Sequence, residues 1–76
     1  MKIEILGTGC AKCNKLYDTT KEAVEQAGVE AELVKVHDIM EIAKRGVLMT
    51  PALVVDGEVK VVGKVPKAAE IAKLLG

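Results

Sequence analysis

The chain has 76 residues, enough for one small domain, and half of them are hydrophobic although Tyr17 is the only aromatic residue. Eleven lysines and arginines balance eleven aspartates and glutamates, which excludes the strongly basic surface typical of nucleic-acid or anionic-membrane binding. No apolar run approaches the roughly 20 residues of a membrane-spanning helix, and the first residues lack a secretory signal pattern. We therefore expect one cytoplasmic domain over residues 1–76.

The first third of the chain predicts a strand followed by a helix. The segment Lys2–Leu6 alternates in character. Ile3 and Ile5 therefore share one face of the strand, and Glu4 lies on the other. After two glycines, apolar residues recur at three- and four-residue steps over residues 10–27, which is typical of an amphipathic helix.

The middle of the chain predicts a second strand and a short helix. Glu30 to Val36 is rich in β-branched and apolar residues. Asp38 is a suitable N-cap for the helix that follows, and Gly46 is a suitable end for it. Strand, helix and strand at this spacing imply a parallel pair joined by a right-handed crossover.

The last third predicts a hairpin and a terminal helix. Ala52–Val55 and Glu58–Val62 are two apolar runs separated by Asp56-Gly57, a strong two-residue turn signal. Pro66 suits the first turn of a helix that continues to Leu75. The predicted order is βαβαββα, an α/β domain with a four-stranded mixed sheet flanked by three helices.

The only two cysteines, Cys10 and Cys13, stand three positions apart at the first strand-to-helix junction. A disulfide between them would close a four-residue loop, which removes only about 2 kcal/mol of unfolded-state freedom. This placement favours a reversible redox couple over a structural crosslink. At the first turn of a helix, unpaired N–H groups and the positive end of the dipole would favour the thiolate of Cys10, with Lys12 adding a small tuning effect.

These motifs resemble the thioredoxin fold in its minimal, glutaredoxin-sized form. The resemblance covers the whole chain and depends on Cys10-Ala-Lys-Cys13 and on Thr50-Pro51 just before the third strand, with Gly63 as a weaker match. The segments are similar to those of small redox-active disulfide proteins of archaea and bacteria. The resemblance implies a monomeric thiol–disulfide oxidoreductase without a cofactor, which reduces protein disulfides and is itself restored by an upstream disulfide reductase.

The resemblance also implies roles for individual residues. Pro51 should be in cis beside Cys10, leaving the backbone of Thr50 open to pair with an extended substrate segment. Gly63 either allows a partner to approach closely or simply ends a strand. Glu4 stands where thioredoxins carry a buried acid that moves protons for the second cysteine, although a strand glutamate in so small a domain is expected to reach solvent.

Two other functions use the same cysteines. A paired thiolate site also suits Cu(I), and small copper carriers have a similar loop, but they differ in element order and carry a methionine where this chain has Thr8. A glutathione-dependent activity stays open as well. A structural zinc site needs four ligands, and His37 is the only histidine, so no structural zinc is expected, and the preferred redox function needs no metal.

Four remaining residues receive structural interpretations. His37 follows the second strand and is interpreted as a surface loop residue. Met40 and Met49 are expected to fill gaps in the core. Arg45 suits the negative end of the second helix and needs no other partner.

Overall fold

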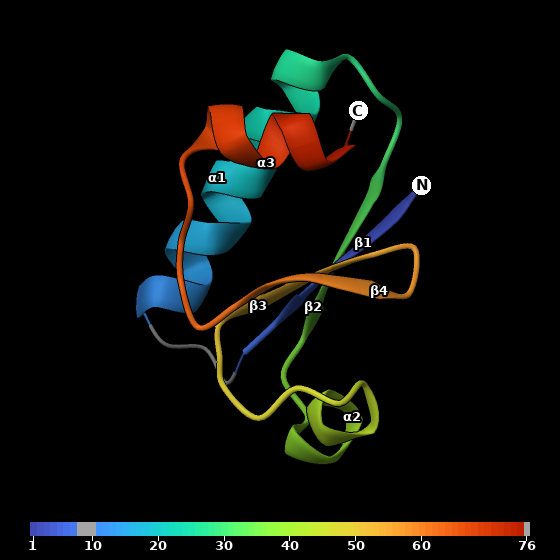
Figure 1. Ribbon diagram of the computed structural model, residues 1–76, viewed down its shortest axis with the longest axis vertical. Helices are drawn as coiled ribbons and strands as arrows, with labels where there is room; N and C mark the ends of the chain where they lie inside the picture. Colours follow the sequence, from blue (N-terminus) through green and yellow to red (C-terminus); the bar gives the residue numbers. More distant parts are fainter. Residues whose placement is uncertain (8–10, 76) are drawn as a thin grey trace.

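The computed structural model describes residues 1–7 and 11–75. Its elements follow the predicted βαβαββα order and confirm it (Figure 1). In chain order they are β1 (Lys2–Leu6), α1 (Ala11–Ala27), β2 (Glu32–Val36), α2 (Ile39–Lys44), β3 (Ala52–Val55), β4 (Glu58–Val62) and α3 (Ala68–Leu75).

The four strands form one mixed sheet in the order β2-β1-β3-β4. The pair β1–β2 is parallel, and the pairs β1–β3 and β3–β4 are antiparallel. The α/β class, the mixed sheet and its three helices are therefore as predicted. The register places Leu6 opposite Ala52, so the end of β1 lies beside the start of β3.

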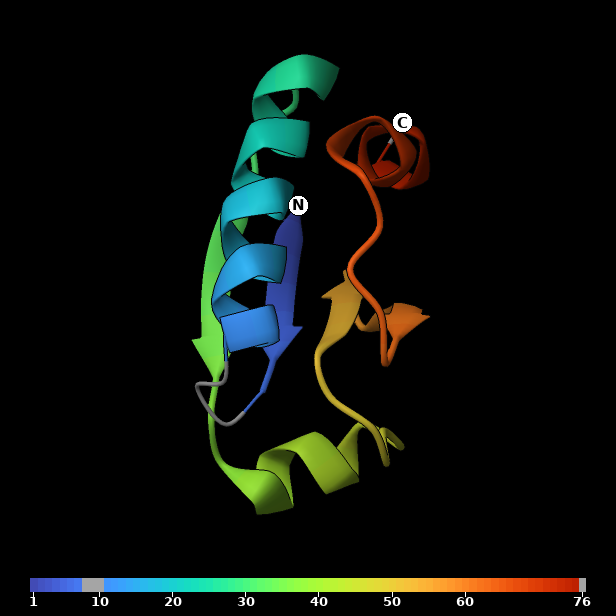
Figure 2. The same ribbon diagram turned by 90° about the vertical axis from the view of Figure 1, so that its left-hand side faces the viewer.

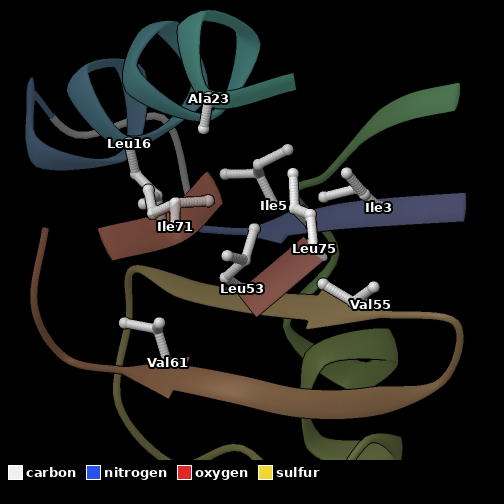
Figure 3. Packing of buried hydrophobic residues seen from close by; sticks show 9 residues of the cluster. All are labelled: Ile3, Ile5, Leu16, Ala23, Leu53, Val55, Val61, Ile71 and Leu75. Carbon is white, nitrogen blue, oxygen red and sulfur yellow. The ribbon is translucent and has the colours of Figure 1, made fainter. Parts of the chain in front are cut away.

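One face of the sheet packs against α1 and α3, which lie side by side (Figure 1). Leu16 and Ala23 of α1 meet Ile71 and Leu75 of α3 over the strands, and Figure 3 shows their side chains converging. The strands contribute Ile3, Ile5, Leu53, Val55 and Val61. This cluster is the larger part of the core, and Tyr17 packs at its margin, half-buried.

The opposite face of the sheet carries a smaller apolar cluster beneath α2. Ile42 of α2 and Val47 pack with buried residues of β1 and β3: Leu6, Ala52 and Val54. Asp38 caps this helix as predicted, because its Oδ1 accepts a hydrogen bond from the backbone N–H of Met40 at 2.8 Å. A helix of six residues is too short to be stable alone, so α2 depends on these contacts.

Two predicted boundaries were wrong. The strand β2 begins at Glu32, not Glu30, because its pairing with β1 begins where Lys2 meets Glu32. The helix α3 begins at Ala68, and its first hydrogen bonds are accepted by the carbonyl of Lys67. Pro66 therefore precedes the helix and does not occupy its first turn. No helix within residues 1–7 and 11–75 combines the length and apolar character needed to cross a bilayer.

Candidate active site

Cys13 lies in the first turn of α1 with its side chain buried. A Cβ built on Gly7 would fall 2.2 Å from Cys13 Sγ, so the sulfur rests against the Gly7 backbone. The N–H of Gly7 donates to the carbonyl of Val36 at 2.9 Å, which extends the β1–β2 ladder to this point. The second cysteine of the motif is therefore held at the end of β1, an inner strand of the sheet, as a strand-to-helix junction predicts.

Cys10, with Thr8 and Gly9, lies outside the described residues. Lys12 is exposed on α1, and the first turn of the helix contains no acidic residue. The helix has 17 residues, so its first turn presents unpaired N–H groups and the positive end of a long dipole. The unpaired N–H groups and the positive end of the dipole favour a thiolate over a thiol at this end of the helix.

Thr50 and Pro51 immediately precede β3, and the peptide bond between them is cis, as the resemblance implied. Pro51 is fully buried, whereas Thr50 is exposed. Since Leu6 pairs with Ala52, the residues one step further out, Gly7 and Pro51, lie at the same end of the sheet. The fold thus brings the cis-proline to the strand end that holds Cys13.

Gly63 joins this region from the end of β4. Its N–H donates to the Pro51 carbonyl at 2.7 Å and continues the β3–β4 ladder by one step. Gly63 has φ of 73°, a conformation that strongly favours glycine. A Cβ on Gly63 would lie 3.3 Å from the terminal methyl of Met49, so this methionine lies across the glycine.

An open apolar pocket of about 320 Å³ adjoins Thr50. Its lining comes from α2 and from the segment that follows it: Ile39, Ile42, Ala43, Val47, Leu48 and Thr50. Leu48 is 94% exposed and Ile39 is 70% exposed. Figure 2 shows α2 and this segment at the same end of the molecule as the start of α1.

The methionines nearby are not core residues, and that prediction was wrong. Met40 and Met49 are largely exposed. The buried face of the short helix is occupied by Ile42, which leaves Met40 outside, and Met49 lies beyond the helix, across Gly63. Ile39 and Leu48, which line the pocket, are exposed as well, and we call these four apolar residues of α2 and the segment after it the α2 surface. Ile39 and Leu48 meet at the pocket, and apolar groups exposed together mark an interaction site more often than scattered ones do. His37 is exposed, as expected.

Glu4 is only 7% exposed, so the expectation that it reaches solvent was wrong. Its side chain lies on the α2 face of the sheet, opposite Ile3 and Ile5, and its Oε2 accepts a charge-assisted hydrogen bond from Nη2 of Arg45. This bond raises the pKa of Arg45 above its usual value. The ion pair joins residues 41 positions apart in the chain.

Sequence reasoning missed the partner of Arg45. Besides Glu4, its guanidinium donates from Nη1 to the Glu41 carbonyl at 2.8 Å and to Glu41 Oε2 at 3.3 Å. No local pattern could have indicated the contact with Glu4, because it depends on how α2 folds under the sheet. Within the described part of the chain, no group of three or more His, Cys, Asp or Glu residues is placed to hold a metal ion.

Comparisons with known proteins agree with this arrangement. The Thioredoxin domain family matches residues 1–76. A thioredoxin of Methanothermobacter thermautotrophicus is 44% identical over 75 residues, covering 99% of this chain and 97% of the relative. A thioredoxin of Methanocaldococcus jannaschii is 47% identical over 73 residues, covering 96% of this chain and 84% of the relative.

These matches support neither the copper-carrier nor the glutathione-dependent alternative. With the cis-proline and the buried cysteine at one end of a βαβαββα sheet, they confirm the resemblance drawn from the motifs. The chain therefore belongs to the thioredoxin family and is a thiol–disulfide oxidoreductase.

Proposed function

We propose that the chain reduces disulfide bonds of other proteins through a reversible Cys10–Cys13 dithiol/disulfide couple. The observation that carries this proposal is the position of Cys13 Sγ, held against Gly7 at the start of α1 and three positions after Cys10 in the sequence. A resolving cysteine must be fixed within reach of the attacking one and shielded from competing reactions. Burial of Cys13 at the N-terminal turn of α1 supports that role.

The exchange proceeds in two steps. The Cys10 thiolate attacks one sulfur of the substrate disulfide, forming a mixed disulfide and releasing the first substrate thiolate, which takes up a proton. The Cys13 thiolate then attacks Cys10 Sγ, forming the Cys10–Cys13 disulfide and releasing the second substrate thiolate. Two electrons pass from the protein dithiol to the substrate. Lys12 contributes at most a weak positive potential, because its exposed charge is screened by water.

Substrate binding is assigned to the segment around Pro51. Thr50 is exposed before β3, and no backbone hydrogen bond joins it to another segment among the residues that the structure describes. An extended substrate strand could pair there through its main chain, which gives affinity without strict side-chain selection. Gly63, hydrogen-bonded to Pro51, lies at the adjoining strand end.

The α2 surface supports a protein as the substrate. Its exposed Leu48 and Ile39 line the Thr50 pocket, and together with the two exposed methionines they could cover apolar surface beside the cysteine under attack. Methionine side chains adapt to differently shaped partners, which suits an enzyme that accepts several proteins. A small thiol such as glutathione would not need so wide an apolar surface.

The wider setting belongs to the same proposal. We place the protein in the cytoplasm, where thiols are kept reduced and a dithiol can act as a reductant. It would act as a monomer, so that the α2 surface stays available to substrates. An upstream disulfide reductase would return two electrons to the Cys10–Cys13 disulfide after each turnover.

The proposal is tested with insulin as the disulfide substrate. The reduced protein, freed of small thiols, is mixed with insulin in equal amounts, and the thiols released on insulin are counted. We expect the wild-type protein to release two thiols per dithiol consumed. Cys13→Ser should accumulate a mixed disulfide with insulin, visible by mass spectrometry, and Cys10→Ser should release none. Unchanged insulin reduction by Cys10→Ser would overturn the mechanism.

A further inference from the structure

Glu4 occupies the centre of the sheet and faces away from α1. The residues that pair with Glu4 on the two adjacent strands are Val34 of β2 and Val54 of β3, both apolar. A carboxylate in such surroundings loses hydration and needs a charged partner. Arg45 supplies that partner from the end of α2, with its side chain 27% exposed and that of Glu4 10% exposed.

Other charged side chains on α2, β2 and β4 have partners of their own. Glu41 of α2 accepts from Arg45 and from Lys44 Nζ, the latter at 3.3 Å. Lys35 of β2 lies on the α1 face, with its Nζ 4.4 Å from the centre of the Tyr17 ring. Lys60 of β4 pairs with Glu58 at 3.2 Å. Glu4 is therefore joined to α2 through Arg45.

Arg45 also stands next to the segment to which we assign substrate binding. It is the C-terminal cap of α2, and Gly46 alone separates it from the segment Val47–Pro51. The N–H of Val47 donates back to the Ile42 carbonyl at 3.4 Å, so the segment continues directly from the helix. Any shift of α2 beneath the sheet would move this segment as well.

Glu4, the partner of Arg45, stands near the part of the site that holds the cysteine pair. Glu4 is three residues before Gly7, on the same strand that holds Cys13 Sγ. The Arg45–Glu4 ion pair thus bridges the strand that fixes the dithiol and the helix that carries the substrate segment. The helices α1 and α2 lie on opposite faces of β1. Apart from the ion pair, the described residues hold α2 only through the smaller apolar cluster, which provides few contacts.

We propose that Arg45 is a positioning residue for disulfide exchange: by holding Glu4, it sets where the segment Val47–Pro51 lies relative to the cysteine pair. In this arrangement Glu4 anchors α2 and does not move protons for Cys13. The inference rests on the proposed function, because it assigns protein substrates to that segment. It differs from a purely structural role in predicting separate effects on large and small disulfides.

The test compares two substrates. Insulin needs the segment Val47–Pro51, whereas 5,5′-dithiobis(2-nitrobenzoate) is a small disulfide that reports thiol reactivity alone. In Arg45→Met we expect KM for insulin to rise about tenfold, within the loss that an ångström-scale misplacement can cause. The rate with the small disulfide, and its dependence on pH, should stay within about twofold of the wild type.

Three further variants complete the design. Arg45→Lys keeps the charge but loses the guanidinium fork, and should recover part of the insulin KM. Lys44→Met is the matched control, because its side chain is exposed and, among the residues described, bonds only Glu41, and it should behave as the wild type. If Arg45→Met does not fold, the double variant Arg45→Met/Glu4→Gln removes both charges and should fold with the raised KM.

Two results would overturn the positioning role while leaving the proposed function intact. One is an unchanged insulin KM in folded Arg45→Met or in the double variant. The other is a shifted pH profile with the small disulfide in Glu4→Gln, which would assign Glu4 to proton transfer. Failure of the wild-type protein to reduce either disulfide would instead reject the proposed function itself.

Discussion

Gly7 and Cys13 are in direct contact at the end of β1. A Cβ on Gly7 would lie 2.2 Å from Cys13 Sγ and 2.9 Å from its Cβ, both closer than non-bonded atoms can approach. The glycine backbone therefore sets how deeply the sulfur is seated. Because Gly7 is itself buried and bonded to Val36, it cannot retreat without breaking the β1–β2 ladder.

Gly7→Ala should displace Cys13 from this position. We expect the free energy of unfolding to fall by about 1–3 kcal/mol, as for other overpacked cores, measured by urea unfolding. The mixed disulfide with insulin should also live longer, because the resolving sulfur is misplaced. Gly28→Ala is the control: its φ is 66° and nothing lies within 4 Å, so it should cost stability without slowing resolution. Equal resolution rates in the two variants would disprove the role of Gly7.

Leu48 should contribute to substrate binding and little to stability. Its side chain is 94% exposed, so Leu48→Ser should change the free energy of unfolding by less than about 0.5 kcal/mol. The KM for insulin should rise about threefold to tenfold if Leu48 covers apolar substrate surface. Leu74→Ser, an exposed position on α3, should leave KM unchanged. A KM that rises equally in both variants would argue for a general loss of apolar surface and against the α2 surface.

The fold was predictable because its main signals are local. Alternation in β1 and the three- and four-residue spacing in α1 each arise from one element burying one face. The hairpin signal at Asp56-Gly57 is confirmed by positive φ at both residues. The boundaries of β2 and α3 were less accurate, because the first depends on where β1 begins and the second on a backbone carbonyl at Lys67.

The residues of the candidate site were predictable only where they belong to a recognisable sequence motif. Two cysteines three apart indicate redox chemistry, and Thr50-Pro51 acquired meaning through the family resemblance. Met40 and Met49 were misassigned to the core. The short helix buries Ile42 and leaves Met40 exposed, and its pattern does not say which side chain is buried, whereas Met49 lies in the irregular segment after the helix, where no periodicity indicates burial. The Arg45–Glu4 pair joins residues 41 positions apart, so tertiary structure alone brings it together.

Gly63 should matter to substrate binding through its neighbour Met49. Gly63→Ala adds a Cβ 3.3 Å from the Met49 methyl and imposes φ of 73° on a residue with a side chain. The backbone term should cost about 1–2 kcal/mol of stability. Gly57→Ala, with φ of 83° and nothing nearby, should cost a similar amount. Only Gly63→Ala should raise the insulin KM, since Gly57 lies at the far turn of the hairpin; equal KM values would make Gly63 a turn residue alone.

The ionisation of Glu41 should make the folding stability of the protein depend on pH in the acidic range. Hydrogen bonds from Lys44 and then from Arg45 lower the pKa of Glu41 below 4.5 in the folded protein. A carboxylate with a lowered folded-state pKa stabilises the protein above its unfolded value, and that contribution is lost as the pH falls through the folded value. The thermal midpoint of the wild type, followed by circular dichroism from pH 7 to pH 3, should therefore fall below about pH 4.5 more than that of Glu41→Gln. Glu25→Gln on the exposed side of α1 serves as the control. If Glu41→Gln and the wild type lost the same number of degrees over this window, the bonds to Glu41 would contribute nothing to folding.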